Sequence, residues 1–162
     1  MTAQKLDRVM RAYRIGDPGG GYPIYDATGS AISPGRWNTT RSPMIYAAEH
    51  YSTGMLEKLV HGSGFMPPNQ HFIEITIPNG VSFEDLTPAH LPGWDDPSCA
   101  ASRPFGERWQ HEKRSALLFV PSVVARMEMN ILINPDHPDF HQVTTSRHQK
   151  IWWDMRLFVA PA

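Results

Sequence analysis

The hydrophobic positions of the chain come mostly in short runs, which is typical of a protein built from short strands. The clearest alternation lies at 72–77, where isoleucine occupies every second position and polar residues lie between, as in a strand with one buried face. Uninterrupted apolar runs favour strands that are buried on both faces. Such a run predicts a strand at 116–120, and two more short strands are predicted at 43–47 and 129–134. Further strands are predicted at 8–15, 81–86 and 151–159.

Two segments repeat their apolar residues at helical spacing. The segment 48–61 predicts a helix with one apolar stripe, formed by Ala48, Tyr51, Met55 and Leu59. Periodicity then puts Glu57 on the opposite, polar face of this helix, where a solvated residue is expected. The second helix is predicted at 105–113, where Phe105 and Trp109 are one turn apart.

Taken together, these elements predict an α+β fold. We expect a single domain over 1–162, with short, mainly antiparallel strands and two or three helices. The chain shows no internal repeat and no shift in composition that would mark a second domain, and 41% of its residues are hydrophobic. A chain of this length buries about two-thirds of its unfolded surface without needing a disulfide or a metal.

Charge and cysteine content narrow the class of function. The net charge of −1 provides no general basic field for nucleic acid or an anionic membrane, and a DNA-binding regulator would need a basic recognition helix. The single cysteine, Cys99, excludes an internal disulfide and fits a reducing compartment. No apolar run reaches about 18 residues and no signal-peptide core is found, so we expect a soluble, cytoplasmic protein.

Several common catalytic motifs are absent. The glycine cluster at 16–21 lacks both the dinucleotide fingerprint and the P-loop pattern, which favours a flexible turn. Among the eight histidines, His137 and His141 have Pro138 between them, and HExxH is missing, so no bound metal is expected. No GxSxG elbow is present, and Cys99 has no base near it in the sequence.

Four residue types remain that could act together. Arg36 follows a Ser-Pro-Gly turn and precedes Trp37; it could cover the tryptophan at the surface, or its planar fork could grip phosphate or ribose oxygens. Ser122 follows an apolar run, where it either faces a cleft or starts a turn. With a tyrosine and a carboxylate, such groups suit cleavage of a glycosidic bond through an oxocarbenium-like transition state, as in loss of nicotinamide from NAD+.

Five sequence blocks together resemble the RES-domain toxins, a family named for arginine, glutamate and serine. The blocks are AYRI, SPGRWN, PMIYAAE leading into LEKLVH, VPS, and EMNILINPDHPDF, in this order between Tyr13 and Phe140. The resemblance implies a fold similar to the diphtheria-toxin-like ADP-ribosyltransferases and an activity that consumes NAD+ as a substrate. It also implies a bacterial toxin–antitoxin pair with a cognate Xre-like antitoxin.

The resemblance carries the family's residues onto Arg36, Tyr46, Glu57 and Ser122, with Ser115 as the alternative serine. It implies that Arg36 grips a phosphate or ribose of NAD+ and that Tyr46 stacks on nicotinamide. Glu57 would hydrogen-bond the ribose and stabilise developing positive charge. Ser122 would position the substrate.

We therefore expect a toxin that degrades NAD+ by transferring ADP-ribose to water or phosphate. The alternatives are a transferase that modifies a cellular protein and a non-catalytic regulator that senses a nucleotide. Asn130 and His137 also lie in family-like segments, and both are given structural roles. The sequence is compatible with two assemblies, a homodimer and a toxin–antitoxin hetero-oligomer.

Overall fold

A computed structural model describes residues 1–158 of the chain. The strands are β1 (Gln4–Lys5), β2 (Met10–Gly16), β3 (Ile45–Ala48), β4 (His71–Ile77), β5 (Ser82–Asp85), β6 (Leu117–Pro121), β7 (Met129–Ile133), β8 (Thr144–Thr145) and β9 (Gln149–Lys150). The α-helices are α1 (Thr28–Ile32), α2 (Tyr51–Gly62) and α3 (Ser102–Glu112). Three 3-10 helices are η1 (Pro88–His90), η2 (Pro138–Gln142) and η3 (Met155–Leu157).

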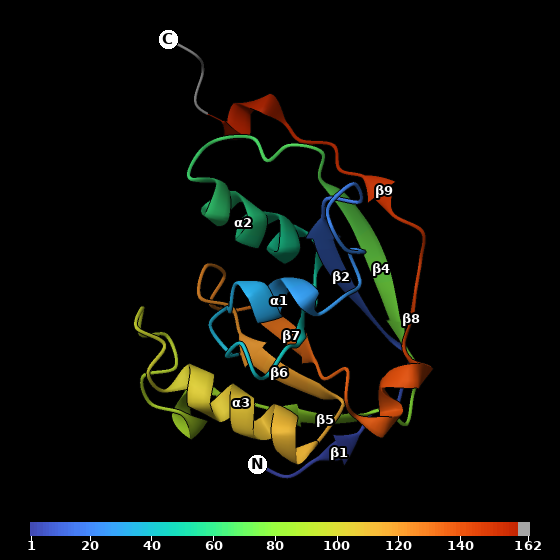
Figure 1. The fold of residues 1–162 in the computed structure, drawn as a ribbon, viewed down its shortest axis with the longest axis vertical. Coiled ribbons are helices and arrows are strands. Elements are labelled where there is room, and N and C mark those ends of the chain that lie inside the picture. Colours follow the sequence, from blue (N-terminus) through green and yellow to red (C-terminus); the bar gives the residue numbers. More distant parts are fainter. Residues whose placement is uncertain (159–162) are drawn as a thin grey trace.

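All nine strands join one curled sheet, shown in Figure 1. Its order is β1-β5-β6-β7-β3-β2-β4-β8, and β9 also pairs with β4. The β5–β6 pair is parallel, whereas the other paired strands run antiparallel. The predicted α+β fold with short, mainly antiparallel strands is therefore confirmed.

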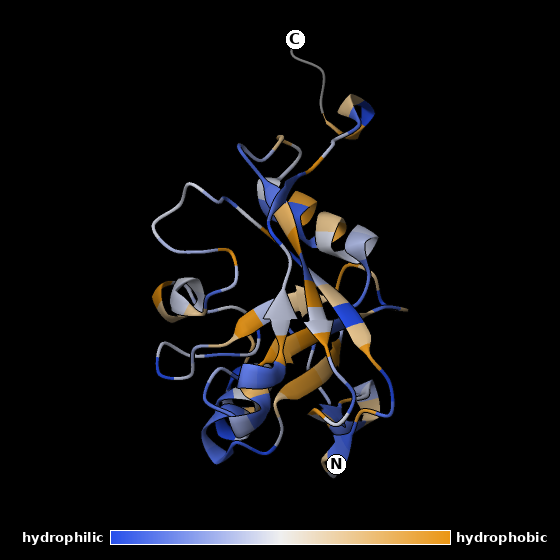
Figure 2. Ribbon diagram, turned by 90° about the vertical axis from the view of Figure 1, so that its right-hand side faces the viewer, coloured by the Kyte–Doolittle hydropathy of each residue, from blue (hydrophilic) through white to orange (hydrophobic). Residues whose placement is uncertain are grey.

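The strands β6 and β7 form the centre of the core because both of their faces are covered. On one face Leu117, Phe119, Ile131 and Ile133 join an aliphatic cluster with residues of β2, β3 and β4. On the other face Leu118, Val120 and Leu132 pack against the tryptophans Trp37, Trp94 and Trp109. Figure 2 shows the strands at the centre of the molecule mostly in the hydrophobic colour. The strands predicted at 116–120 and 129–134 thus correspond to β6 and β7.

Some predicted elements differ from the structure. The short elements β1, α1, β8 and β9 were not predicted, because two to five residues carry too little periodicity. The C-terminal strand predicted at 151–159 is wrong over 151–158; Val159 lies outside the described residues. In its place the Asp154 carboxylate accepts a hydrogen bond from the Arg156 backbone N–H at 2.9 Å and starts η3. Such local side-chain bonds compete with strand pairing.

The helix α2 turns a different face to the protein than periodicity predicts. Of its side chains, Thr53 on the predicted polar face is the one that is buried, at 2% exposed. Tyr51, Met55 and Leu59 of the predicted apolar stripe are half-buried. One helical turn after Thr53, Glu57 consequently faces inward and is half-buried. Among residues 1–158, no helix is long and apolar enough to cross a bilayer.

The helix α3 lies directly on the backbone of the turn that carries Arg36. A Cβ added to Gly106 would stand 1.8 Å from the carbonyl oxygen of Trp37, far inside a van der Waals contact. The Ser102 hydroxyl donates to the Arg36 carbonyl at 2.7 Å. Arg103 Nε donates to the Gly35 carbonyl at 2.9 Å. The start of α3 therefore fixes the path of the chain through 35–37.

We predict that Gly106→Ala destabilises the protein even though alanine is the better helix former. The added methyl forces α3 away from Trp37, and such overpacking costs about 1–3 kcal/mol of unfolding free energy. The matched control is Gly54→Ala in α2, where a Cβ would meet Ile15 and Ala48 at the ordinary distances of 3.6 and 3.7 Å. Urea denaturation of both variants measures the difference; equal stability of the two would contradict the close packing.

Candidate active site

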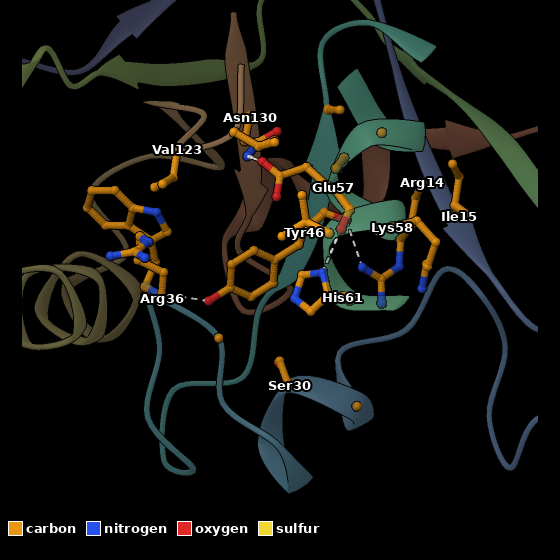
Figure 3. Close-up of a pocket in the computed structure, with 18 of the residues that line it drawn as sticks. Arg14, Ile15, Ser30, Arg36, Tyr46, Glu57, Lys58, His61, Val123 and Asn130 are labelled. Carbon is orange, nitrogen blue, oxygen red and sulfur yellow. Dashed lines mark hydrogen bonds between the residues drawn. The ribbon is translucent and has the colours of Figure 1, made fainter. Parts of the chain in front are cut away.

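A pocket of about 700 Å³ opens between α2, α1, the 33–37 turn and the loop that follows β6. Figure 3 shows its lining. Its size lies within the range of about 300–1,000 Å³ that is usual for small-molecule sites. Arg36, Tyr46 and Glu57 all line this pocket. The structure thus brings together three of the four residues that the sequence singled out.

The fourth residue, Ser122, lies behind Glu57. It is fully buried, and its hydroxyl donates to Oε1 of Glu57 at 2.8 Å. The same hydroxyl oxygen accepts from the Ala125 backbone N–H at 3.0 Å, which fixes its orientation. Ser122 therefore contacts the carboxylate and not the pocket. Ser115, the alternative serine, is instead bonded to the indole N–H of Trp109 at 2.9 Å, within the core.

Oε1 of Glu57 receives a second hydrogen bond, from Nδ2 of Asn130 at 2.7 Å. Two donors on one oxygen restrict the rotation of a side chain that otherwise has three free torsions. Since Glu57 and Asn130 both line the pocket, the carboxylate is anchored at its wall. The sequence analysis gave Asn130 a structural role. Its contact with Glu57 joins residues that are 73 positions apart, so no sequence motif could reveal it.

Arg36 lies on another wall of the pocket and is partly immobilised. Its Nη1 donates to the carbonyl oxygens of Asp96 at 2.8 Å and Trp94 at 3.3 Å. A guanidinium has five N–H donors, so these two bonds engage only one of its three nitrogens. The rest of the fork can bind a ligand oxygen while the side chain keeps its place.

Tyr46 joins the two sides of the pocket. Its hydroxyl accepts from the Trp37 backbone N–H at 3.0 Å and donates to Oδ1 of Asn38 at 2.8 Å. Gly35 is required beside it, since a Cβ there would approach this hydroxyl to 2.7 Å. Burial raises the pKa of Tyr46, so the phenol stays neutral. With its hydroxyl engaged, Tyr46 offers its ring to the pocket.

Three cations that the sequence analysis missed, Arg14, Lys58 and Arg103, also line the pocket. Arg14 on β2 donates to the carbonyl of Ile24 at 2.5 Å and to that of Tyr46 at 2.7 Å. Lys58 follows Glu57 on α2, and burial, with a contribution from Arg14, lowers its pKa. Burial also lowers the pKa of Arg14, but an arginine remains charged at neutral pH. The sequence signal that could have indicated Arg14 is its place inside a predicted strand, next to the apolar Ile15 and two positions from Ala12.

The pocket therefore combines one anchored carboxylate with several cations. This pattern suits a ligand that carries both negative charge and a positively charged or hydroxyl-bearing group. Among residues 1–158, no group of three or more histidine, cysteine, aspartate or glutamate side chains could hold a metal ion.

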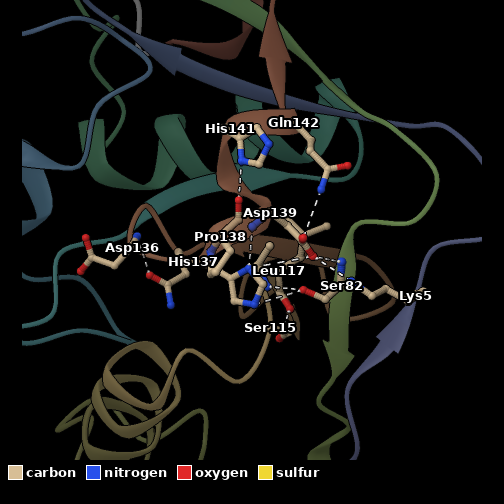
Figure 4. Close-up of polar contacts among 12 residues, drawn as sticks. Lys5, Ser82, Ser115, Leu117, Asp136, His137, Pro138, Asp139, His141 and Gln142 are labelled. Carbon is tan, nitrogen blue, oxygen red and sulfur yellow. Dashed lines mark hydrogen bonds and ion pairs between the residues drawn. The ribbon is translucent and has the colours of Figure 1, made fainter.

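A second polar cluster joins Ser82, His137 and Asp139, and Figure 4 shows it. Nδ1 of His137 accepts from the Asp139 backbone N–H at 3.0 Å. Burial lowers the pKa of His137, so the ring is neutral and its proton lies on Nε2, 3.4 Å from the Ser82 hydroxyl. A protonated Nε2 cannot take a proton from that serine. The geometry therefore does not support a nucleophilic Ser82, and the structural role of His137 stays a prediction.

Asp139 is the charged centre of this second cluster. Its Oδ2 accepts from the Ser82 backbone N–H at 3.0 Å and from Nζ of Lys5 at 3.1 Å. Burial alone would raise the pKa of Asp139, but the hydrogen bonds from Ser82 and Lys5 outweigh it and hold the pKa at about 2. The carboxylate thereby ties η2 to β1 and β5.

The fold and the pocket together define an α+β protein with an anchored glutamate opposite arginine. Residues 11–154 match the RES domain family, so the chain belongs to the RES-domain family. The resemblance drawn from the sequence motifs is confirmed.

Curated relatives with the same domain are toxins. The Prs ADP-ribosylating toxin of Sphingobium sp. (strain YBL2) is 41% identical over 134 residues, covering 80% of this chain and 83% of the relative. The toxin Res of Pseudomonas putida (strain KT2440) is 34% identical over 120 residues, covering 72% and 81%. A chain in the crystal structure of the M. tuberculosis MbcT–MbcA toxin–antitoxin complex shares the fold, with a TM-score of 0.69 at 13% identity over 91% of this chain and 86% of that chain.

We predict that Tyr46→Phe lowers the free energy of unfolding by about 1–3 kcal/mol, because it leaves the Trp37 N–H without its acceptor. Tyr51→Phe is the control, since it removes the hydroxyl of another half-buried tyrosine whose ring packs edge-on against Tyr13 and Phe72. Denaturant unfolding compares the two. A Tyr46→Phe chain as stable as the control would show that the hydroxyl does not secure the turn.

We predict a pH-dependent loss of stability for Asp139→Asn. The pKa of Asp139 falls from 3.8 to about 2 on folding, so its stabilisation is complete above about pH 4 and disappears as the pH falls toward 2. At pH 7 the variant should be less stable by about 1.5–3 kcal/mol, as for hydrogen bonds to a charged group. Denaturation at a series of pH values tests this; a gap that stays constant down to pH 3 would refute the assignment.

Proposed function

We propose that this protein is the toxin of a toxin–antitoxin pair and that it breaks the bond between nicotinamide and ribose of NAD+. One observation carries the proposal: Glu57 is anchored at the wall of a pocket that Arg14, Lys58 and Arg36 also line. NAD+ presents a pyrophosphate and a cationic nicotinamide ribose, and the pocket contains a counter-charge for each. Membership of the RES-domain family supports the same substrate.

The chemistry needs stabilisation of positive charge more than proton transfer. As the bond from C1′ to the pyridinium nitrogen breaks, its electron pair goes to nicotinamide, which leaves as a neutral molecule. Positive charge then develops on the ribose, and the Glu57 carboxylate stabilises it electrostatically. An oxygen of the acceptor bonds to C1′ and its proton passes to water. The cations hold the pyrophosphate, and the Tyr46 ring supports the leaving base.

Two acceptors of the ADP-ribose are supported by different observations. The 41% identical relative is named for ADP-ribosylation of Prs, which favours a protein acceptor. The degradation expected from the sequence, with water or phosphate as acceptor, is supported by the cationic lining, which would attract a phosphate ion. An antitoxin partner is supported by the structural neighbour, which comes from a toxin–antitoxin complex, and an Xre-like antitoxin is proposed from the motifs.

The proposal predicts that the antitoxin-free protein releases nicotinamide from NAD+ and that Glu57→Gln lowers the rate at least about 100-fold, as loss of a group that stabilises transition-state charge does. The variant keeps the shape of the side chain and removes its charge. Products are resolved by mass, with and without phosphate and with a bacterial lysate. Glu49→Gln, which alters a glutamate outside the pocket lining, is the control and should stay active.

The products distinguish the acceptors. Free ADP-ribose, or its 1-phosphate when phosphate is added, identifies degradation, whereas a lysate protein that gains the mass of ADP-ribose identifies transfer. Absence of nicotinamide under every condition would overturn the proposal and leave the nucleotide-sensing regulator. Full activity of Glu57→Gln would overturn the role of Glu57.

A further inference from the structure

We propose that Asn130 is a positioning residue for Glu57: with Ser122 it occupies one carboxylate oxygen, Oε1, so that the other, Oε2, is presented to the ribose. The inference rests on the proposed function and extends it to a residue without an assigned part in the reaction. It concerns the direction of the carboxylate and not the binding of NAD+ itself.

The two donors come from different parts of the sheet. Asn130 lies on β7, paired with Ala48 of β3 and Val120 of β6, and its Nδ2 lies 2.7 Å from Oε1 of Glu57. Ser122 follows the end of β6 and reaches the same oxygen at 2.8 Å. Glu57 itself is on α2. Its carboxylate is therefore held from the central sheet and from the loop after β6, independently of the helix backbone.

Chemistry fixes the orientation of the Asn130 amide. An ionised carboxylate only accepts hydrogen bonds, so the NH2 group of the amide has to face Glu57. The reverse orientation would place two acceptors against each other. Figure 3 shows the amide nitrogen directed at Glu57.

The other end of the same amide makes no bond. Oδ1 of Asn130 is buried and has no hydrogen-bond partner among residues 1–158. An unpaired buried acceptor lowers stability, so a purely structural role would favour an apolar side chain at this position. The amide fits the site only through its contact with Glu57.

Asn134, just past the end of β7, provides the contrast. It is fully buried, its Nδ2 donates to the Gln110 carbonyl at 2.9 Å, and its Oδ1 accepts from the Asp136 N–H at 3.0 Å. Both ends of this amide are satisfied, as expected of a structural asparagine. Asn130 lies in β7 and Asn134 directly follows it, so the two residues form a matched pair for mutation.

The experiment compares Asn130→Ala with Asn134→Ala in nicotinamide release. Without the Asn130 donor the carboxylate rotates about its remaining bond to Ser122, and a misplaced catalytic group costs on the order of 10- to 100-fold in rate. For Asn130→Ala we expect kcat to fall by this factor, KM for NAD+ to change little, and the unfolding midpoint to stay near that of the wild type. Asn134→Ala should unfold at a lower temperature and keep the kcat of its folded fraction.

A second variant covers a failure of Asn130→Ala to fold. Asn130→Asp keeps the shape of the side chain, but it has an oxygen in place of the donor and adds a like charge beside Glu57. It should lose at least as much kcat as Asn130→Ala. Rates of all variants are expressed per folded molecule, measured from the amplitude of the unfolding transition.

The outcomes separate this inference from the proposed function. A wild-type protein that releases no nicotinamide refutes the proposed function. An active wild type with both Asn130 variants within about twofold of its kcat refutes the positioning role alone. A rise in KM without a fall in kcat would also refute it, because Asn130 would then bind the substrate and not orient Glu57.

Discussion

A carboxylate that is half-buried at the wall of a pocket has to receive hydrogen bonds, and this requirement organises the site. The donors reach Glu57 from β7 and from the end of β6, while α2 itself packs against β2 and β3. That placement turns Thr53 inward and gives the helix a polar inner face. The same placement brings Lys58 to the pocket wall. Thr53 and Glu57, one turn apart, therefore lie on the inward-facing side of α2.

A second constraint holds the opposite wall. The 35–37 turn is bound by the Tyr46 hydroxyl on one side and by the start of α3 on the other. The carbonyl oxygen of Tyr46 also accepts a hydrogen bond from the Arg14 guanidinium. Tyr46 on β3 therefore links β2 to the 35–37 turn, which α3 holds from its other side. Arg36 is positioned by backbone contacts at both ends, and little of its side-chain freedom remains to be lost when a ligand binds.

The sequence predicted the sheet better than it predicted the site. Alternation at 72–77 and the apolar runs at 116–120 and 129–134 marked β4, β6 and β7, because burial on one or both faces leaves a direct pattern. Periodicity placed Glu57 in solvent, and only the family motifs identified it as a candidate. The C-terminal alternation failed because Asp154 and Arg156 form a local turn, an interaction that hydrophobic patterning does not contain.

Contacts between distant segments explain what the sequence analysis missed. Asn130 and Glu57 are far apart in the chain and meet only because β7 pairs with β3, which leads into α2. Arg14 enters the site through the pairing of β2 with β3. Neither contact produces a periodic signal or a short motif. A tertiary contact of this kind becomes visible only when the register of the sheet is known.

The charges of the pocket explain how a protein with a net charge of −1 could hold an anionic substrate and stabilise a cation. Local fields depend on arrangement and not on net charge. Arg14, Lys58 and Arg36 line the pocket together with Glu57, and the hydrogen bonds from uncharged Ser122 and Asn130 keep the carboxylate in place without neutralising it. An ion pair to one of the nearby cations would also anchor Glu57 but would cancel the charge that the proposed reaction needs. Neutral donors hold the carboxylate and preserve that charge, which is why the identity of these two residues matters as much as their position.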